Sequence, residues 1–363
     1  MPISQVPFAG ISNPVNFRNR IINGDMQIDQ RNNGSAVTVN SYATFFSVDR
    51  FKFIGQDTDG VFTAQRSSTA PTGFVNSLLI TVTTADSSLT SSQEYTVRQD
   101  IEGYNIADLG FGTANAKTVT LSFWVRSSVT GAFGGSFLNN GGSRTNPFSY
   151  TISSANTWEY KTITVTGDTT GTWNTTTSTG LSVMWSLGVG TGLKGTAGTW
   201  SGSTFYAPTG SVNLISTSGA TLYITGVQLE AGEQASGFEF MPIDVDLARC
   251  QRYFQKSYDL TTVPATSTDV GKVEIGLASV GSGDVIITVP YKVSMRATPT
   301  ATLYSSAGSS GSWNFDRNGS ITTGTITAYT SRMGQNFLVA YLQCGSGYVV
   351  CTINGHYTVS AEL

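Results

Sequence analysis

Short runs of alternating apolar and polar residues dominate residues 20–240. The clearest run spans residues 119–126, where Val119, Leu121 and Phe123 alternate with Thr120, Ser122 and Trp124. A period of two is typical of half-buried β-strands. Clusters of Gly, Asn and Ser separate the runs, as turns separate antiparallel strands. We therefore predict an all-β protein in which residues 20–240 form a jelly-roll β-sandwich.

Residues 241–257 have a helical pattern instead. Pro242 lies at the start, acidic residues occupy the first turn and basic residues follow, which is the usual order of charges along a helix. One narrow apolar stripe recurs at helical spacing, and it consists of Ile243, Leu247, Cys250 and Phe254. The stripe either packs against a sheet of its own chain or closes a seam between three chains. We predict a helix here that connects two domains.

Residues 20–257 are flanked by two further segments. Strand patterns resume from about residue 258, and about 100 residues suffice for a second, smaller C-terminal β-sandwich over 258–363. Residues 1–19 contain Pro2, Pro7 and Pro14 and have no charged side chain before Arg18, so we predict an extended arm. The arm is either a frayed terminus or a peptide that docks on a partner.

Composition narrows the range of partners. Charged residues make up 12% of the chain, against about 25% in ordinary globular proteins. The net charge of −3 gives no basic footprint for nucleic acid. No apolar stretch approaches the roughly 20 residues of a membrane span, and the first residues do not have the pattern of a signal peptide. We therefore expect that the chain neither binds nucleic acid nor inserts into a membrane. We also expect that it is made in the cytoplasm.

Residues for catalysis are scarce. His356 is the sole histidine and follows Gly355, so we expect it in a surface turn. A glycosidase needs two carboxylates about 5–10 Å apart, and the pairs close enough in sequence are Asp57 with Asp59 and Asp100 with Glu102, besides Glu94. Such carboxylates are more commonly solvated or paired with a neighbour such as Arg98. We predict that the chain is not an enzyme.

Two kinds of ligand have candidate residues. Asp25, in Asn23-Gly24-Asp25, and Asp29 are weak candidates for calcium, although an Asn-Gly turn needs no metal; no other cofactor is expected. Exposed aromatic rings contact sugars, and the candidates for carbohydrate contact are Trp124, Trp158, Trp173, Trp200 and Trp313. Each has the alternative of a core position, and Trp313 has the most loop-like surroundings.

Several segments together resemble a group of bacteriophage virion proteins. They are residues 19–31, 48–51, 95–104, 120–127, 158–165, 223–232 and 247–254, so the resemblance covers about residues 16–256. Residues 289–299 and 361–363 resemble the terminal domains of phage fibre proteins. The N-terminal domain is also similar to carbohydrate-binding-module jelly rolls. It departs from them at Thr225-Gly226, where such modules commonly carry an acidic calcium ligand, so neither calcium nor sugar binding carries over.

The resemblance implies a structural protein of the virion, assembled in the host cytoplasm. Our first hypothesis is a trimeric tail fibre or receptor-binding adhesin, anchored to other virion proteins by residues 1–19 and touching a host surface glycan. The homotrimer follows from the family and from the helix stripe. The alternative is a capsid decoration protein or head fibre. A polysaccharide depolymerase is a third option, which the missing catalytic constellation disfavours.

Overall fold

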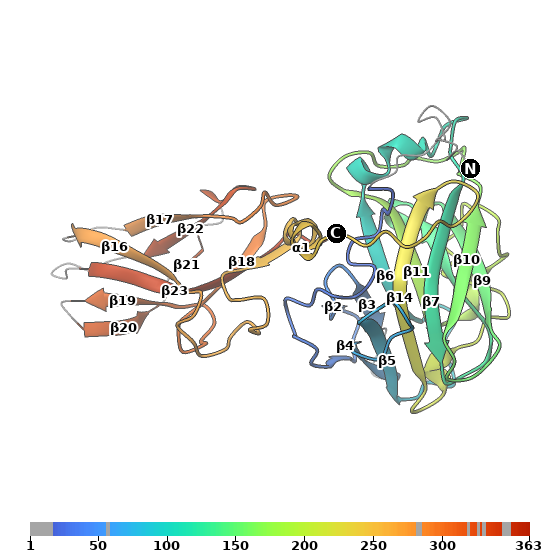
Figure 1. Cartoon of the computed structure of the whole chain (residues 1–363), viewed down its shortest axis with the longest axis horizontal. Coiled ribbons are helices and arrows are strands. Elements are labelled where there is room, and N and C mark those ends of the chain that lie inside the picture. Colours follow the sequence, from blue (N-terminus) through green and yellow to red (C-terminus); the bar gives the residue numbers. More distant parts are fainter. Residues whose placement is uncertain are drawn as a thin grey trace, which may run out of the picture.

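The computed structural model describes residues 17–55, 59–280, 285–317, 320–324, 327–328, 332–342 and 350–363. It contains two β-rich domains with a short helix between them, and the last residues return to this junction (Figure 1). Antiparallel pairing dominates both domains. The predicted fold class, an all-β chain with a jelly-roll sandwich, a short helix and a second β domain, is confirmed.

The N-terminal domain consists of two six-stranded sheets packed face to face. We call the first one sheet A; its strand order is β1-β4-β5-β14-β7-β10. Its strands are β1 (Val37–Val39), β4 (Val61–Ser67), β5 (Ser77–Thr84), β14 (Thr221–Ala231), β7 (Val119–Ser127) and β10 (Glu159–Val165). The non-sequential order, with β14 between β5 and β7, is the crossover pattern expected of a jelly roll.

The second sheet, sheet B, has the order β2-β3-β6-β11-β8-β9. Its strands are β2 (Thr44–Phe46), β3 (Lys52–Gly55), β6 (Glu94–Glu102), β11 (Thr179–Val189), β8 (Gly131–Leu138) and β9 (Thr145–Ile152). The segment after β11 carries the short strands β12 (Lys194–Gly195) and β13 (Ala207–Pro208), together with single 3-10 turns. Contacts of β13 with β8 and β9 place this segment beside sheet B.

The alternation seen in the sequence decides which side chains fill the space between the sheets. Phe123 of β7 and Trp185 of β11 are fully buried, and their rings meet edge to face with centroids 5.6 Å apart. Trp124, the residue after Phe123 in β7, points to the outer face of sheet A and is half-buried. Burial of one large apolar side chain contributes about 1.5–3 kcal/mol, so the inward residues of both sheets hold the sandwich together.

The C-terminal domain is built around one long strand, β23 (Val350–Ser360). β15, β16, β18 and β19 all pair with it, and β19 also pairs with β20. A second sheet has the order β17-β22-β21. The strands are β15 (Phe254–Lys256), β16 (Val273–Val280), β17 (Val285–Pro290), β18 (Thr300–Tyr304), β19 (Trp313–Arg317), β20 (Ser320–Gly324), β21 (Thr327–Ala328) and β22 (Phe337–Leu342).

The connecting helix α1 (Ile243–Gln251) is shorter than predicted. Phe254 belongs to β15, because pairing with Ser360 of β23 replaces the helical hydrogen bonds. Most of the predicted stripe therefore packs within its own chain, which is the first of its two alternatives. Cys250 packs in a cluster with Ile22, Ile28, Tyr253, Leu247 and Leu363, and Phe254 is also buried. Only Ile243 of the stripe is exposed, at 48%.

A buried ionic network joins the two domains. Glu362 pairs with both Arg50 and Arg31. The Arg50 guanidinium lies 3.5 Å from the centre of the Tyr253 ring, and that of Arg31 lies 3.7 Å from the Phe254 ring. Arg31 and Arg50 of the N-terminal domain are thus held by Glu362, close to the end of the chain, which lies beside α1 in Figure 1.

Candidate functional site

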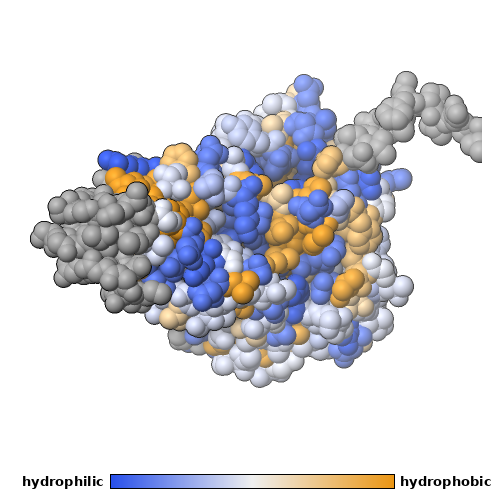
Figure 2. All heavy atoms as spheres, turned by 60° about the vertical axis from the view of Figure 1, so that its left-hand side comes forward, coloured by the Kyte–Doolittle hydropathy of each residue, from blue (hydrophilic) through white to orange (hydrophobic). Residues whose placement is uncertain are grey.

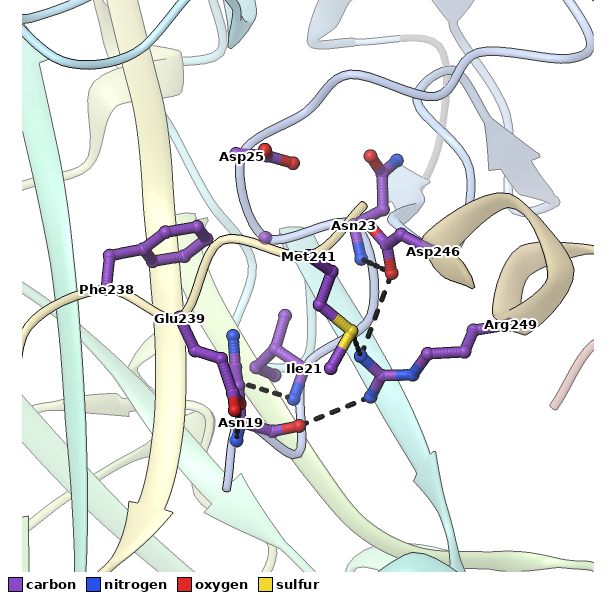
Figure 3. Close-up of a pocket in the computed structure, with 10 residues that line it drawn as sticks. Asn19, Ile21, Asn23, Asp25, Phe238, Glu239, Met241, Asp246 and Arg249 are labelled. Atoms are coloured by element: carbon purple, nitrogen blue, oxygen red, sulfur yellow. Dashed lines mark hydrogen bonds and ion pairs between the residues drawn. The ribbon is translucent and has the colours of Figure 1, made fainter. Parts of the chain in front are cut away.

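A small hollow lies where the first described residues, the tail after β14 and α1 meet (Figure 3). Its volume is about 10 Å³. Arg249 donates to the Asn19 carbonyl oxygen at 3.2 Å and lies 3.7 Å from Asp246, whose carboxylate accepts from the Asn23 amide. At this volume the hollow has room for no more than about one water molecule, so it is a structural junction and not a ligand site.

Asp25 and Asp29, the calcium candidates, have different roles here. The Asp29 carboxylate accepts from the amides of Asn32 and Gly34 at 2.8 and 2.6 Å and so fixes a turn. Asp25 accepts from the Gln27 side chain. Within the described part of the chain, no group of three or more His, Cys, Asp or Glu residues is placed to hold a metal ion.

A larger, polar hollow lies on the outer face of sheet B, and we call it the cleft. Its volume is about 330 Å³, which is within the range of about 300–1,000 Å³ usual for small-ligand pockets. Arg98 and Asp100 of β6 and Ser182 of β11 form the floor, because the even-numbered residues of both strands face away from the core. Tyr206 and the glycine turn at Asn139–Gly142 form the walls.

Electrostatic interactions fix the charge of the cleft floor. Burial opposes ionisation of Asp100, but Arg98, Lys52 and the hydrogen bonds from Lys52 and Ser182 outweigh it and lower the pKa of this carboxyl. Asp100 is therefore an ionised acceptor at neutral pH. The Arg98 side chain is 23% exposed and its Nε atom lies 3.5 Å from Asp100. A cation and an anion side by side, with a hydroxyl and an aromatic ring, can bind both donors and acceptors of a polyhydroxylated ligand.

The carboxylates near the cleft do not form a hydrolytic pair. Burial raises the pKa of Glu94, which is the property of a general acid, whereas Asp100 stays ionised. These residues are six positions apart on one strand, or about 20 Å at roughly 3.3 Å per residue, whereas a glycosidase needs about 5–10 Å. Glu102 pairs with Arg252 at 2.6 Å and accepts from Tyr253, so it belongs to the domain junction. Asp57 lies outside the described residues.

Aromatic side chains gather on the outer face of sheet A. Trp124 of β7 lies opposite Tyr160 of β10, with ring centroids 5.4 Å apart, and Trp158 contacts Tyr223 at 6.0 Å. Beside them, β14 bulges at Gly226, whose φ is 62°. A Cβ there would lie 2.7 Å from the Phe74 ring and 3.1 Å from Trp124, so glycine permits these rings to meet.

The structure separates the five predicted sugar-contacting tryptophans. Trp124 lies half-buried on the outer face of sheet A, and Trp158 lies half-buried just before β10. Trp313 is fully buried in β19 and donates to the His356 carbonyl oxygen at 2.6 Å, so its predicted loop position is wrong. Trp173 is 7% exposed, and Trp200 packs edge-on against it, so both rings serve the domain core.

His356 also differs from its predicted surface position. It is fully buried in β23, and its ring stacks on Tyr258 with centroids 3.8 Å apart. Sequence reasoning overlooked Tyr206 as a site residue, because it lies in an irregular segment without periodicity. Arg98 was noted only as a partner for carboxylates. The outward alternation of Arg98, Asp100 and Ser182 on neighbouring strands was the available signal.

Comparisons with known proteins give the following results. No protein-family model matches the chain, and no curated protein matches it. Among solved structures, the enzymatically active domain of tailspike protein 4 from bacteriophage CBA120 is similar to 59% of this chain, with 12% identity and a TM-score of 0.31. The matched part makes up 22% of that tailspike chain.

Other similar structures have carbohydrate-related descriptions. A protein of Bacteroides thetaiotaomicron VPI-5482 proposed to bind sugar matches 59% of this chain over its whole length, with 13% identity and a TM-score of 0.35. TmCBM61, solved with β-1,4-galactotriose, matches 50% of this chain over 88% of its own, with 10% identity and a TM-score of 0.26. No helix among the described residues is long and apolar enough to cross a membrane.

Proposed function

We propose that this chain is a non-catalytic adhesin of a phage virion that binds a host surface glycan in the cleft of sheet B. The observation that carries the proposal is the composition of the cleft. Arg98, Asp100 and Ser182 converge on its floor, and Tyr206 supplies an aromatic wall. Sugars present hydroxyl donors and acceptors together with apolar ring faces, which such a surface matches.

The polar floor is held rigidly before any ligand arrives. Lys52 pairs with Asp100 and also donates to a main-chain oxygen of Leu363 at 2.9 Å. Arg50 donates to the Asp100 carbonyl oxygen at 2.7 Å. Because these contacts order the floor within the folded chain, a ligand does not have to pay for that ordering, and preorganisation favours affinity.

The assembly of the adhesin is also part of the proposal. Resemblance to phage fibre proteins supports a homotrimer attached to other virion proteins through residues 1–19. We expect light scattering on the purified chain at micromolar concentration to give about three times the chain mass of 38.5 kDa. A chain that is monomeric under these conditions contradicts the trimer and leaves the glycan site untouched.

Replacing Tyr206 by alanine is expected to weaken glycan binding about ten-fold. Loss of an aromatic wall removes stacking worth about 0.5–1.5 kcal/mol and the apolar area that accompanies it. The measurement starts with an array of bacterial O-antigen and capsular oligosaccharides, followed by titration calorimetry with the tightest binder. Tyr206→Phe keeps the ring and should bind nearly as well as the parent chain.

The control for this experiment lies on the opposite sheet. Tyr160 is 44% exposed on sheet A, so Tyr160→Ala should leave glycan affinity unchanged. If Tyr160→Ala weakens binding and Tyr206→Ala does not, the site lies on sheet A. Failure of the parent chain to bind any glycan on the array contradicts the proposed function.

A further inference from the structure

Two adjoining hollows form an apolar groove on the sheet A side of the N-terminal domain. The aromatic residues that line the larger, of about 620 Å³, are Phe74, Trp124, Tyr160, Phe238 and Phe240. The smaller, of about 250 Å³, is lined by Phe17, Glu239, Phe240, Met241, Pro242 and Val245. Phe240 belongs to both and is 56% exposed. Figure 2 shows hydrophobic residues gathered on a face of the molecule near the point where the described chain begins. Contiguous exposed apolar surface of this kind marks an interaction site.

The chemistry of the groove favours an uncharged apolar chain over a sugar. No charged side chain lines the larger hollow, and Glu239, the charged residue at the smaller one, accepts from the Asn19 amide. Two of its polar groups have partners inside the protein: the Ser236 hydroxyl donates to Glu230 at 2.7 Å, and the Gly237 carbonyl oxygen accepts from Arg18. The lining of the larger hollow offers a sugar a few hydroxyl groups and no charged partner, and each sugar hydroxyl that loses its hydration without a replacement hydrogen bond costs about 1–3 kcal/mol.

The described chain begins at this groove. Phe17 lines the smaller hollow and is 65% exposed. Arg18 donates to the Gly237 carbonyl oxygen at 2.7 Å, and the Asn19 amide donates to Glu239 at 2.9 Å. These bonds fix the point from which residues 1–16 depart, next to both hollows.

Residues 1–16 have a composition that matches the groove. They contain no charged side chain, and their apolar residues include Ile3, Val6, Phe8 and Ile11. Sixteen residues reach at most about 50–60 Å when extended, which is enough to cover both hollows. Attachment at Phe17 gives this segment an effective concentration in the millimolar range, an advantage that a segment from another molecule does not have.

We propose that residues 1–16 bind in the apolar groove of their own chain. In this arrangement the apolar side chains of the segment, Phe8 among them, would occupy the hollow that Phe74, Trp124 and Phe240 line. The proposal rests on the groove and on the start of the described chain, so it is independent of glycan binding in the cleft.

Photocrosslinking of the full chain tests this docking. Phe8→p-benzoylphenylalanine is irradiated at low micromolar concentration, and crosslinked peptides are identified by mass spectrometry. We expect crosslinks within one chain to peptides that contain residues 72–74, 122–124 or 235–240. Phe240→Ser should reduce their yield at least about five-fold, whereas Tyr42→Ser, at a residue that is 68% exposed away from the groove, should not.

Each other outcome overturns the proposal. A crosslinked dimer on a denaturing gel shows that the segment binds a neighbouring copy instead. Crosslinks confined to other surfaces, or a yield no higher than that of the unfolded chain in urea, show that the groove does not bind it. Because Phe240 is largely exposed, the Phe240→Ser variant should fold, and its circular dichroism spectrum checks this.

Discussion

Replacing Glu362 by alanine should lower the free energy of unfolding by about 3–5 kcal/mol, the largest effect we expect of any single substitution. The Glu362 carboxylate neutralises Arg50, whose side chain is 2% exposed, and Arg31. Burial disfavours the charge on Arg50, but Glu362 and other neighbours outweigh this and raise its pKa. Removal of one partner leaves a buried charge uncompensated, and such losses cost about 3–5 kcal/mol.

Urea unfolding followed by tryptophan fluorescence measures this effect. Glu362→Gln keeps the shape but not the charge and should be almost as destabilising. Glu233 is exposed after β14, so Glu233→Ala should stay within about 0.5 kcal/mol of the parent chain. If Glu362→Ala is as stable as Glu233→Ala, the network does not hold the junction together.

The second large effect is a dependence of stability on pH through Asp49. Burial raises the pKa of Asp49 to about 6, despite Arg31 and two hydrogen bonds from Gln30. Glu362 adds to the rise, and Lys256 is the other charged group that interacts with it. The folded chain therefore holds this proton more tightly than the unfolded chain, whose value is 3.8.

The sign of the effect follows from this difference. The stabilisation from the bound proton is complete below pH 3.8 and is lost as the pH rises through 6. At about 1.4 kcal/mol per pKa unit, the shift corresponds to about 3 kcal/mol, of which about 2 kcal/mol is lost between pH 4.5 and 7. Asp49→Asn cannot titrate, so the parent chain should lose that amount relative to the variant over this range.

Urea unfolding of both chains at several pH values gives this difference directly, and other titrating groups cancel in it. A difference that stays constant from pH 4.5 to pH 7 contradicts the raised pKa. If the parent chain instead gains stability relative to Asp49→Asn as the pH rises, the charge of Arg31 outweighs burial and lowers the pKa of Asp49.

The parts of the fold that depend on local pattern were predictable. Alternation in residues 119–125 correctly predicted that Val119, Leu121 and Phe123 of β7 enter the core. Phe254 was assigned to the helix because its spacing is helical, whereas pairing with Ser360, more than 100 residues later, makes it a strand residue. A pairing partner so far along the chain cannot be recognised from the residues that surround Phe254.

The candidate site was harder to predict for the same reason. The cleft combines Arg98 of β6, Ser182 of β11, the turn at Asn140 and the irregular segment that contains Tyr206, and only the sheet order brings them together. Trp313 was assigned to a loop because Gly and Ser flank it. Its pairing with β20 and its hydrogen bond to the His356 carbonyl oxygen place it inside the C-terminal domain. Residue type alone did not distinguish a core tryptophan from a ligand-contacting one.

A crystal structure of the full chain with the tightest-binding oligosaccharide of the array tests the central claim most directly. We predict sugar density in the cleft, with hydroxyls within hydrogen-bond distance of Arg98, Asp100 and Ser182 and a ring face on Tyr206. Sugar bound in the apolar groove of sheet A or on the C-terminal domain, with the cleft empty, would contradict it.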